Sequence, residues 1–423
     1  MSSGRDLNAS SEPKRLLIGL LLFALAVRGG VLLMPDALRA DPDNYRRLAE
    51  NLLEHGTLGE GNVPTAYRPP LYPLVLAGCL ALGDWSRVTI GLVHLLLGLA
   101  TVWMVFLLAK RWGLGRYALV AAGLVACDPI LLAQSALLMS ETLATFLVVA
   151  ALLCLTSAVE RPTVTRAAAA GAAAAVVALC RPGLLLWTLA SAVVLPAFVR
   201  PSSMRLKIYG AFVIAAAVVL APWAVRNQAR FGRPILTTTH GGYTLLLGNN
   251  PWFYEYLRSG PWGSVWDADE LHRSRTNPAD EVRAEWIAYA EACRSIFHEP
   301  GMFLYACAVR VGRLWQPLPH QVHPDEGPLG RLVRYAVGLW YLAEFLLAAA
   351  GLWAVWRGGH GEQHARRVWF WGLLLAGCMT AVHTVYWTNM RMRAPLMPVV
   401  ALAAAAGIAW VESRRHERKS FQE

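Results

Sequence analysis

Two carboxylates follow the first apolar segment of the chain within a few residues. Leu16 to Met34 is long and apolar enough to cross a bilayer as a helix, and Asp41 and Asp43 come soon after it. A third carboxylate, Glu141, begins a later apolar run. Carboxylates at such positions can take a proton from an acceptor hydroxyl or amine, or can bind a divalent metal ion. Asp41 and Glu141 are therefore candidate catalytic residues, with a metal ion held by the same pair as an open alternative.

Each of these carboxylates also has a structural alternative. A short amphipathic run starts near Asn44, and aspartate is favoured at the N-cap of a helix. We expect Asp43 to be that cap and Asp41 to be available for chemistry. Glu141 lies close to membrane depth, where ionisable side chains are costly and tend to be functional. Its structural alternative is a helix N-terminal partner of Ser140.

Arginines stand at the ends of several apolar segments. Arg68 precedes two prolines that fix an extended turn, Arg226 follows an Ala-Pro-Trp sequence, and Arg391 and Arg393 precede the last apolar run. Guanidinium groups pair well with phosphate, and arginines on the outer side of a membrane oppose the usual charge bias. We expect these four arginines to bind an anionic substrate group. Contact with ordinary lipid headgroups is the alternative for Arg68.

A polar, glycine-containing stretch lies between these arginines. It carries His240 in a Thr-Thr-Thr-His-Gly-Gly sequence and Asn249 in a Gly-Asn-Asn-Pro sequence. It matches neither a Walker A loop nor a dinucleotide fingerprint. Tight turns with such polar groups could bind sugar hydroxyls, and a hairpin is the structural alternative. His240 and Asn249 are thus candidate substrate-binding residues, together with Asp43 and Tyr45.

The composition indicates a polytopic membrane protein. Of 423 residues, 56% are hydrophobic and 16% are charged, and the mean hydropathy is +0.39. The net charge of +11 comes from basic residues that lie mostly in short loops between apolar runs. That placement is typical of the cytoplasmic loops of membrane proteins and argues against nucleic-acid binding. The seven cysteines show no metal-ligand spacing, and a bridge between Cys293 and Cys307 stays open.

The basic loops set the expected topology, with both termini in the cytoplasm. The apolar piece from Pro69 to Gly83 would break the alternation of loops if it crossed the membrane, so we expect it to lie along the outer surface. About ten spans remain, at residues 16–34, 88–109, 117–134, 141–159, 163–179, 184–199, 208–223, 335–356, 368–386 and 394–410.

This pattern predicts an all-α polytopic membrane protein in three parts. Residues 1–225 form an N-terminal transmembrane catalytic module with an outer loop at 36–87. Residues 226–334 form an extracytoplasmic loop or cap. Residues 335–423 hold the C-terminal transmembrane helices and a basic cytoplasmic tail.

Several short motifs, in order along the chain, resemble those of the GT-C membrane glycosyltransferases. The closest group is family 39-like, with the protein O-mannosyltransferases and the lipid A aminoarabinose transferase. The motifs are Asp41-x-x-x-Tyr45, Arg68-Pro69-Pro70-Leu71, Ser140-Glu141-Thr142-Leu143, Pro222-Trp223-x-x-Arg226-Asn227, Gly248-Asn249-Asn250-Pro251 and Arg393-x-Pro395-x-x-Pro398. The chain departs from the aminoarabinose transferases, which have lysine in place of Arg68, and it lacks the large inserted domain of the mannosyltransferases.

The resemblance implies a GT-C-like bundle with juxtamembrane helices on the outer face, in a bacterial inner membrane. It implies transfer of a sugar from a polyprenyl-phosphate donor to a lipid, glycan or protein acceptor outside the cytoplasm. By the same resemblance Asp41 is the base, Glu141 stands at a second acidic position, and Arg68 contacts the donor phosphate. The alternative is a lipid or solute transporter. Transporters tend to carry internal repeats and midplane charges, whereas here the charges gather at one face.

Overall fold

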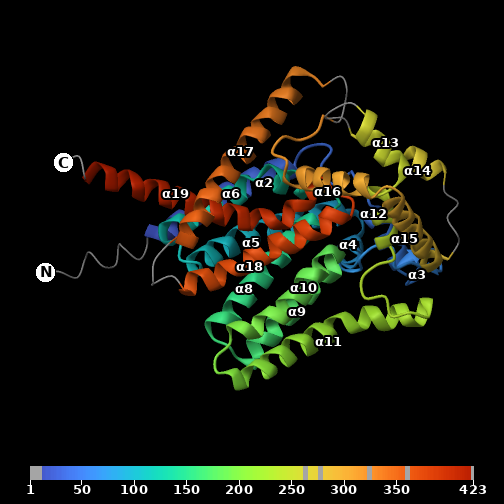
Figure 1. Ribbon diagram of the computed structural model, residues 1–423, viewed down its shortest axis with the longest axis horizontal. Coiled ribbons are helices and arrows are strands. Elements are labelled where there is room, and N and C mark those ends of the chain that lie inside the picture. The colour runs from blue at the N-terminus through green and yellow to red at the C-terminus, as the bar shows by residue number, and fades with distance from the viewer. Residues whose placement is uncertain (1–11, 261–264, 275–279, 322–325, 358–362, 421–423) are drawn as a thin grey trace.

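The apolar runs of the chain fold into helices, because a backbone in hydrocarbon must satisfy its own hydrogen bonds. The computed structural model describes residues 12–260, 265–274, 280–321, 326–357 and 363–420. Within them, a bundle of long helices carries a group of shorter helices at one end (Figure 1). The predicted all-α class is confirmed, and the described residues add only one small hairpin of strands β1 (Gly59–Glu60) and β2 (Val63–Pro64).

In the described chain, seven helical stretches are long and apolar enough to cross a membrane. An eighth is a pair of helices that bends by 49° between Cys127 and Pro129. Two shorter apolar stretches, Val164–Cys180 and Pro182–Phe198, occupy the places of the fifth and sixth expected spans. The prediction of about ten bundle helices in a multi-pass membrane protein therefore agrees with the structure.

The helices of the bundle have the following bounds: α2 Glu12–Leu32, α5 Ser86–Arg111, α6 Ala118–Cys127, α7 Pro129–Ser135, α8 Glu141–Glu160, α9 Val164–Cys180, α10 Leu185–Val194, α11 Arg205–Phe231, α17 Pro328–Arg357, α18 Gln363–Val385 and α19 Met397–Ser420. Short 3-10 turns adjoin them at Gly83–Trp85, Gly115–Tyr117, Pro182–Leu184, Leu195–Phe198, Ser202–Met204 and, as η7, Met390–Leu396. Helix α11 continues past Arg226 until Gly232 ends it in a left-handed conformation.

The shorter helices are α3 Tyr45–His55, α4 Leu71–Leu80, α12 Gly241–Gly248, α13 Pro251–Ser259, α14 Asp269–Arg273, α15 Glu281–His298 and α16 Pro300–Trp315. Helix α4 has 10 residues and packs against α3. At a rise of about 1.5 Å per residue it covers roughly half of a bilayer core, so the segment from Pro69 to Gly83 is too short to cross as a helix.

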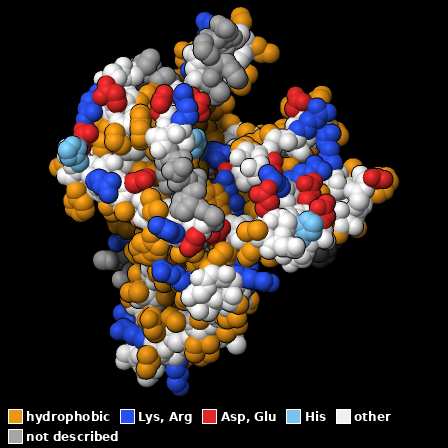
Figure 2. All heavy atoms as spheres, turned by 90° about the vertical axis from the view of Figure 1, so that its right-hand side faces the viewer, with side chains coloured by type: hydrophobic (Ala, Val, Ile, Leu, Met, Phe, Trp, Pro, Cys, Tyr) orange, Lys and Arg blue, Asp and Glu red, His pale blue; other side chains and the backbone are white. Residues whose placement is uncertain are grey.

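The two ends of the bundle differ in character. The start of α2 and the end of α19 lie at the left of Figure 1, while α3, α13, α14 and α15 lie at the right. Figure 2 looks onto that right-hand face, where acidic and basic side chains are interspersed over the upper half and hydrophobic ones predominate below. Apolar residues of α11 such as Leu206, Ile214 and Val218 are exposed, as expected for side chains that face lipid.

Close helix contacts in the bundle depend on small residues. A Cβ atom added at Gly351 of α17 would lie 2.0 Å from the carbonyl oxygen of Ala403 in α19, and one at Gly407 would lie 2.0 Å from that of Leu347. Small residues let membrane helices approach until their backbones touch. In a bilayer the hydrophobic effect does not favour helix association, so van der Waals contact between the backbones stabilises the pair. The close packing of α17 against α19 thus requires glycine at positions 351 and 407, because any larger side chain would clash.

We predict that Gly351→Leu lowers the stability of the purified protein by about 1–3 kcal/mol, because the two helices must separate. Thermal unfolding in detergent measures this change. Gly377→Ala in α18 is the matched control, since its added Cβ meets nothing within 4 Å. Equal melting temperatures for Gly351→Leu and the control would contradict the packing argument.

Candidate active site

A cavity of about 870 Å³ lies where the bundle meets the outer helices. It is lined by the loop before α3, the turn before α4, the start of α8, the α9–α10 junction, α12, α15 and the segment around η7. Most of these places are helix ends or turns, and α12 and α15 add side chains from within the helices. Side chains far apart in the sequence thus line one space. Asp43, Tyr45, Arg68, Glu141, His240 and Arg391, all predicted to act on substrate, line this cavity.

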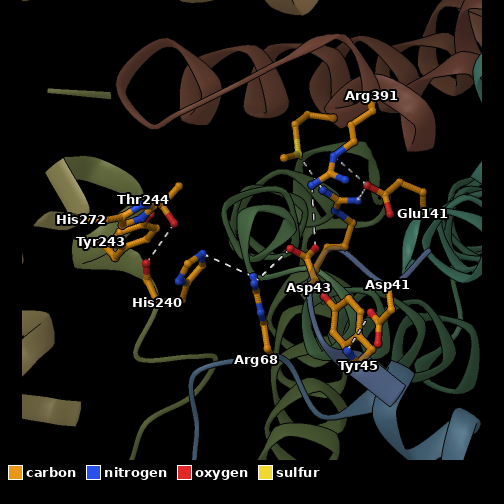
Figure 3. A network of polar contacts seen from close by, with 12 residues as sticks. Asp41, Asp43, Tyr45, Arg68, Glu141, His240, Tyr243, Thr244, His272 and Arg391 are labelled. Atoms are coloured by element: carbon orange, nitrogen blue, oxygen red, sulfur yellow. Dashed lines mark hydrogen bonds and ion pairs between the residues drawn. The ribbon is translucent and has the colours of Figure 1, made fainter. Parts of the chain in front are cut away.

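Three arginines surround two carboxylates in the cavity (Figure 3). Arg68 Nη2 lies 3.0 Å from Asp43 Oδ1, and Arg391 Nη2 lies 3.8 Å from the other oxygen of Asp43. Arg181 Nη1 lies 3.0 Å from Glu141 Oε1, and Arg391 Nε lies 3.7 Å from the same oxygen. Arg391 therefore joins the two pairs. At this end of the cavity three cations face two anions, whereas Glu281 and Glu285 line the cavity elsewhere. The local surplus of positive charge suits an anionic ligand.

The Glu141–Arg181 pair is the most buried part of this cluster. The side chain of Glu141 is 1% exposed, and that of Arg181 is 17% exposed. Glu141 is the first residue of α8, where the helix dipole favours a negative charge. Arg181 lies in extended conformation between α9 and α10. Arg181 was not among the predicted site residues, although Arg181-Pro182 repeats the arginine–proline signal of Arg68.

The start of α3 is bonded by Asp41 and not by Asp43. Asp41 Oδ1 accepts from the backbone N–H of Tyr45 at 2.9 Å, and its Oδ2 accepts from that of Arg46 at 2.7 Å, so Asp41 satisfies the start of α3. The expectation that Asp43 is the cap was wrong, because Asp43 is engaged by the arginines. Burial raises the pKa of Asp41 above its ordinary value. Figure 3 shows Asp41 beside Tyr45.

His240 stands between the arginine cluster and the outer helices. Its Nε2 lies 3.5 Å from Arg68 Nη1, and its ring packs edge-on against Tyr67 at 4.3 Å between centroids. Burial and the neighbouring Arg68 charge lower the pKa of His240 to about 3. The imidazole is therefore neutral at physiological pH. It can exchange hydrogen bonds with a bound ligand without adding charge.

Three predicted substrate-binding residues lie outside the cavity lining. Their side chains bond backbone carbonyls where helices or loops end: Arg226 those of Leu58 and Thr65, Asn249 those of Leu245 and Val385, and Arg393 those of Leu314 and Gln316. Arg393 also lies 4.4 Å from the ring centre of Tyr341. Proteins satisfy buried carbonyls in this way because an unpaired one is costly. The structure gives these three residues a role in holding the backbone.

The far end of the cavity is built by α12 and α15 rather than by a hairpin. Tyr243, Glu281, Glu285 and Tyr289 line it, and none of them was predicted from the sequence. Gly242 lets the two helices touch, since a Cβ there would lie 2.2 Å from the carbonyl oxygen of Glu285. The one sequence signal for this site was the four-residue spacing of the two glutamates along one helix face.

The donor set does not fit a bound metal ion. Among the described residues, no group of three or more histidine, cysteine, aspartate or glutamate side chains is placed to hold one. Asp41 bonds backbone amides, and Glu141 pairs with Arg181. Cys293 and Cys307 are both free thiols, so they form no bridge.

We predict that Arg181→Met destabilises the protein by about 3–5 kcal/mol, because it leaves Glu141 buried beside fewer positive charges. The double variant Glu141→Gln/Arg181→Met should regain most of that loss, since it removes both charges. Thermal unfolding in detergent at neutral pH measures both. A double variant as unstable as Arg181→Met would show that packing, not charge pairing, sets the cost.

The low pKa of His240 predicts a pH dependence of stability. Unfolded histidine has a pKa of 6.5 and folded His240 one of about 3, so the unfolded state binds the additional proton between these values. Stability should therefore fall as pH drops below 6.5, and His240→Asn should reduce this fall. Melting temperatures of both proteins from pH 7.5 to 4.5 test the prediction. Parallel curves would mean that folding does not lower the pKa of His240.

Residues 67–225, less than half of the chain, match the family model described as dolichyl-phosphate-mannose-protein mannosyltransferase. No curated protein shows significant sequence similarity to the chain. The segment that matches contains Arg68, Glu141 and Arg181, which are three of the charged residues of the cavity.

Solved structures extend the similarity to nearly the whole chain. The apo oligosaccharyltransferase of Archaeoglobus fulgidus is 16% identical with a TM-score of 0.54, over 96% of this chain and 52% of that one. The archaeal oligosaccharyltransferase AglB from the same organism, in complex with an inhibitory peptide and a dolichol-phosphate, is 15% identical with a TM-score of 0.53, over 97% of this chain and 52% of that one. ArnT from Cupriavidus metallidurans bound to undecaprenyl phosphate is 16% identical with a TM-score of 0.43, over 89% and 77%.

This chain spans about half the length of the archaeal oligosaccharyltransferase that it resembles. At this identity the likeness concerns the fold. Together with the family match, it identifies the chain as a multi-pass membrane protein with the GT-C fold, similar to the family 39 group.

Proposed function

We propose that this protein is a membrane glycosyltransferase that moves a sugar from a polyprenyl-phosphate donor to an acceptor on the extracytoplasmic side. The observation that carries the proposal is the cluster of Arg68, Arg181 and Arg391 around two carboxylates in one large cavity. The family match of residues 67–225 supports glycosyl transfer. The phosphate-linked lipids named for AglB and ArnT support a donor of the same class.

In this proposal the arginines stabilise the leaving group, which is the polyprenyl phosphate. As the bond between the sugar C1 and the phosphate oxygen breaks, negative charge grows on the polyprenyl phosphate. Preplaced guanidinium groups stabilise that charge more strongly in the transition state than in the ground state. Arg391 is held loosely, at 3.7 and 3.8 Å from its two carboxylates, so it can turn to an incoming phosphate at little cost.

In this proposal a carboxylate near the cavity receives the proton of the acceptor. The acceptor oxygen bonds to C1, the C1–phosphate bond breaks, and the acceptor proton passes to the carboxylate. Asp41 is our candidate, since its pKa is raised by burial and its oxygens bond amides rather than arginines. Asp41 is not itself a lining residue of the cavity, but its Oδ1 bonds the backbone N–H of Tyr45, which lines it. Asp43 shares its two oxygens between Arg68 and Arg391, so we assign it to holding them. Glu141 likewise holds Arg181 and Arg391.

The acceptor enters from the outer helices in this proposal. The far end of the cavity presents phenols, threonine hydroxyls and the neutral imidazole of His240, which suit a hydroxyl-bearing lipid, glycan or peptide. The outer helices lie opposite the start of α2 and the end of α19 (Figure 1). In this proposal both termini lie in the cytoplasm of a bacterial cell and the cavity faces outward, an orientation that the basic residues at that opposite end support by the charge rule.

We predict that Asp41→Asn lowers sugar transfer by roughly 100-fold or more, the usual effect of losing a general base. Asparagine keeps one acceptor oxygen for the start of α3 but places its NH2 group against the second backbone N–H, so the melting temperature should fall modestly while the variant stays folded. The assay supplies labelled polyprenyl-phosphate sugars to membranes that contain the wild type or the variant, and measures label in lipid, glycan and protein fractions. Asp36→Asn, at a side chain that is 92% exposed, is the matched control.

Two outcomes would change the assignment. An active Asp41→Asn beside an inactive but folded Asp43→Asn would make Asp43 the base. Absence of transfer by the wild type from every donor would remove the glycosyltransferase proposal and favour a transporter.

A further inference from the structure

We propose that Glu281 is a positioning residue that ties the outer helices to the phosphate-binding end of the cavity and sets the place of Arg68. The inference deepens the proposed function and rests on it. Glu281 opens α15, more than 200 residues away from Arg68 in the sequence. None of the motifs along the chain includes it.

The carboxylate of Glu281 receives hydrogen bonds from two separate segments. Its Oε1 accepts from the backbone N–H of Ala66 at 2.7 Å and from Thr239 Oγ1 at 3.2 Å. Its Oε2 accepts from Thr65 Oγ1 at 2.6 Å. Three donors on one carboxylate use most of its acceptor capacity, so this side chain is committed to these contacts. Bonds to a charged acceptor are also the stronger kind.

The two segments that Glu281 joins also bond each other. The N–H of Thr239 donates to the carbonyl of Ala66 at 3.0 Å, and both residues are buried, at 2% and 0% exposure. Thr65 Oγ1 in turn accepts from the N–H of Tyr67 at 2.9 Å. The contacts of Glu281 therefore reach the residues directly before Arg68 and directly before His240.

Arg68 and His240 meet because of this arrangement. The turn before Arg68 is held on one side by Arg226, which donates to the carbonyls of Leu58 and Thr65 at 3.0 and 2.9 Å. On the other side it is held by Glu281. Arg226 belongs to the bundle helix α11 and Glu281 to the outer helix α15. Arg68 thus lies where the helix bundle meets the outer helices. The outer helices contact the turn before Arg68 through Glu281.

The position of α15 explains why a glutamate suits this place. Asp280 caps the helix by accepting from the N–H groups of Val282 and Arg283, which leaves the side chain of Glu281 free to turn toward Thr65 and Ala66. A negative charge in the first turn is favoured by the helix dipole. Aspartate would be shorter by one methylene group and could not span both segments from the same backbone position.

The first test compares Glu281→Ala, Glu281→Gln and Glu270→Ala in the transfer assay. Glu281→Ala should lower kcat/KM for the donor by about tenfold or more, since a misplacement of about 1 Å can cost on the order of 100-fold. Glu281→Gln should recover most of it, because glutamine can accept from Ala66 and donate to Thr65. Glu270, paired only with Arg273 at the surface in the described chain, is the control and should keep wild-type values.

A double-mutant cycle tests whether the effect passes through Arg68. In an Arg68→Ala background, Glu281→Ala should add less than about threefold, since coupled residues are not additive. Amide exchange provides a readout that does not need activity: residues 65–68 and 239–240 should exchange faster in Glu281→Ala than in the wild type.

Unchanged exchange in these residues, or independent and multiplying effects of the two substitutions, would overturn the inference. Absence of transfer by the wild type would count against the proposed function instead. The exchange comparison would then still decide whether Glu281 fixes the two segments.

Discussion

The pairing of buried charges is the constraint on which the cavity depends. Glu141 at 1% exposure would be strongly destabilising alone, and Arg181 beside it removes that cost. Arg391 bridges this pair to Asp43, and Asp43 holds Arg68. Each side chain is kept in place by a partner of opposite charge from another segment. The cluster has one cation more than it has carboxylates, and this cation can attract an anion.

Several helices end close to the cluster of arginines and carboxylates. Prolines follow Asp128 and Arg181, and glycine or asparagine ends or begins several neighbouring helices. Proline removes a backbone donor and ends or kinks a helix. The chain thus interrupts its spans near one end of the bundle and there exposes polar side chains. Close glycine contacts such as Gly351 with Ala403 and Gly407 keep the rest of the bundle tightly packed.

The geometry of the site depends on residues that bond the backbone as well as on the residues that line the cavity. Arg226 and Glu281 hold the turn before Arg68 from two sides. Arg393 bonds the carbonyls at the end of α16 and so fixes η7, which presents Arg391 to the cavity. A guanidinium satisfies several carbonyls at once, which makes arginine effective both at binding phosphate and at fixing loops. Residue type alone does not separate these two uses.

The sequence by itself determined the all-α membrane class, the approximate number and place of the bundle helices, and the cavity residues that adjoin apolar spans. Hydrophobic length, basic loops and arginine–proline turns are local signals, so they can be read along one stretch of chain. Only the tertiary structure decided that Asp41 caps α3 while Asp43 pairs with arginine, that Arg181 joins the site, and that Arg226, Asn249 and Arg393 bond backbone. The role of a charged side chain depends on which partner lies within about 4 Å, and those partners come from segments far apart in sequence, such as Glu281 with Ala66.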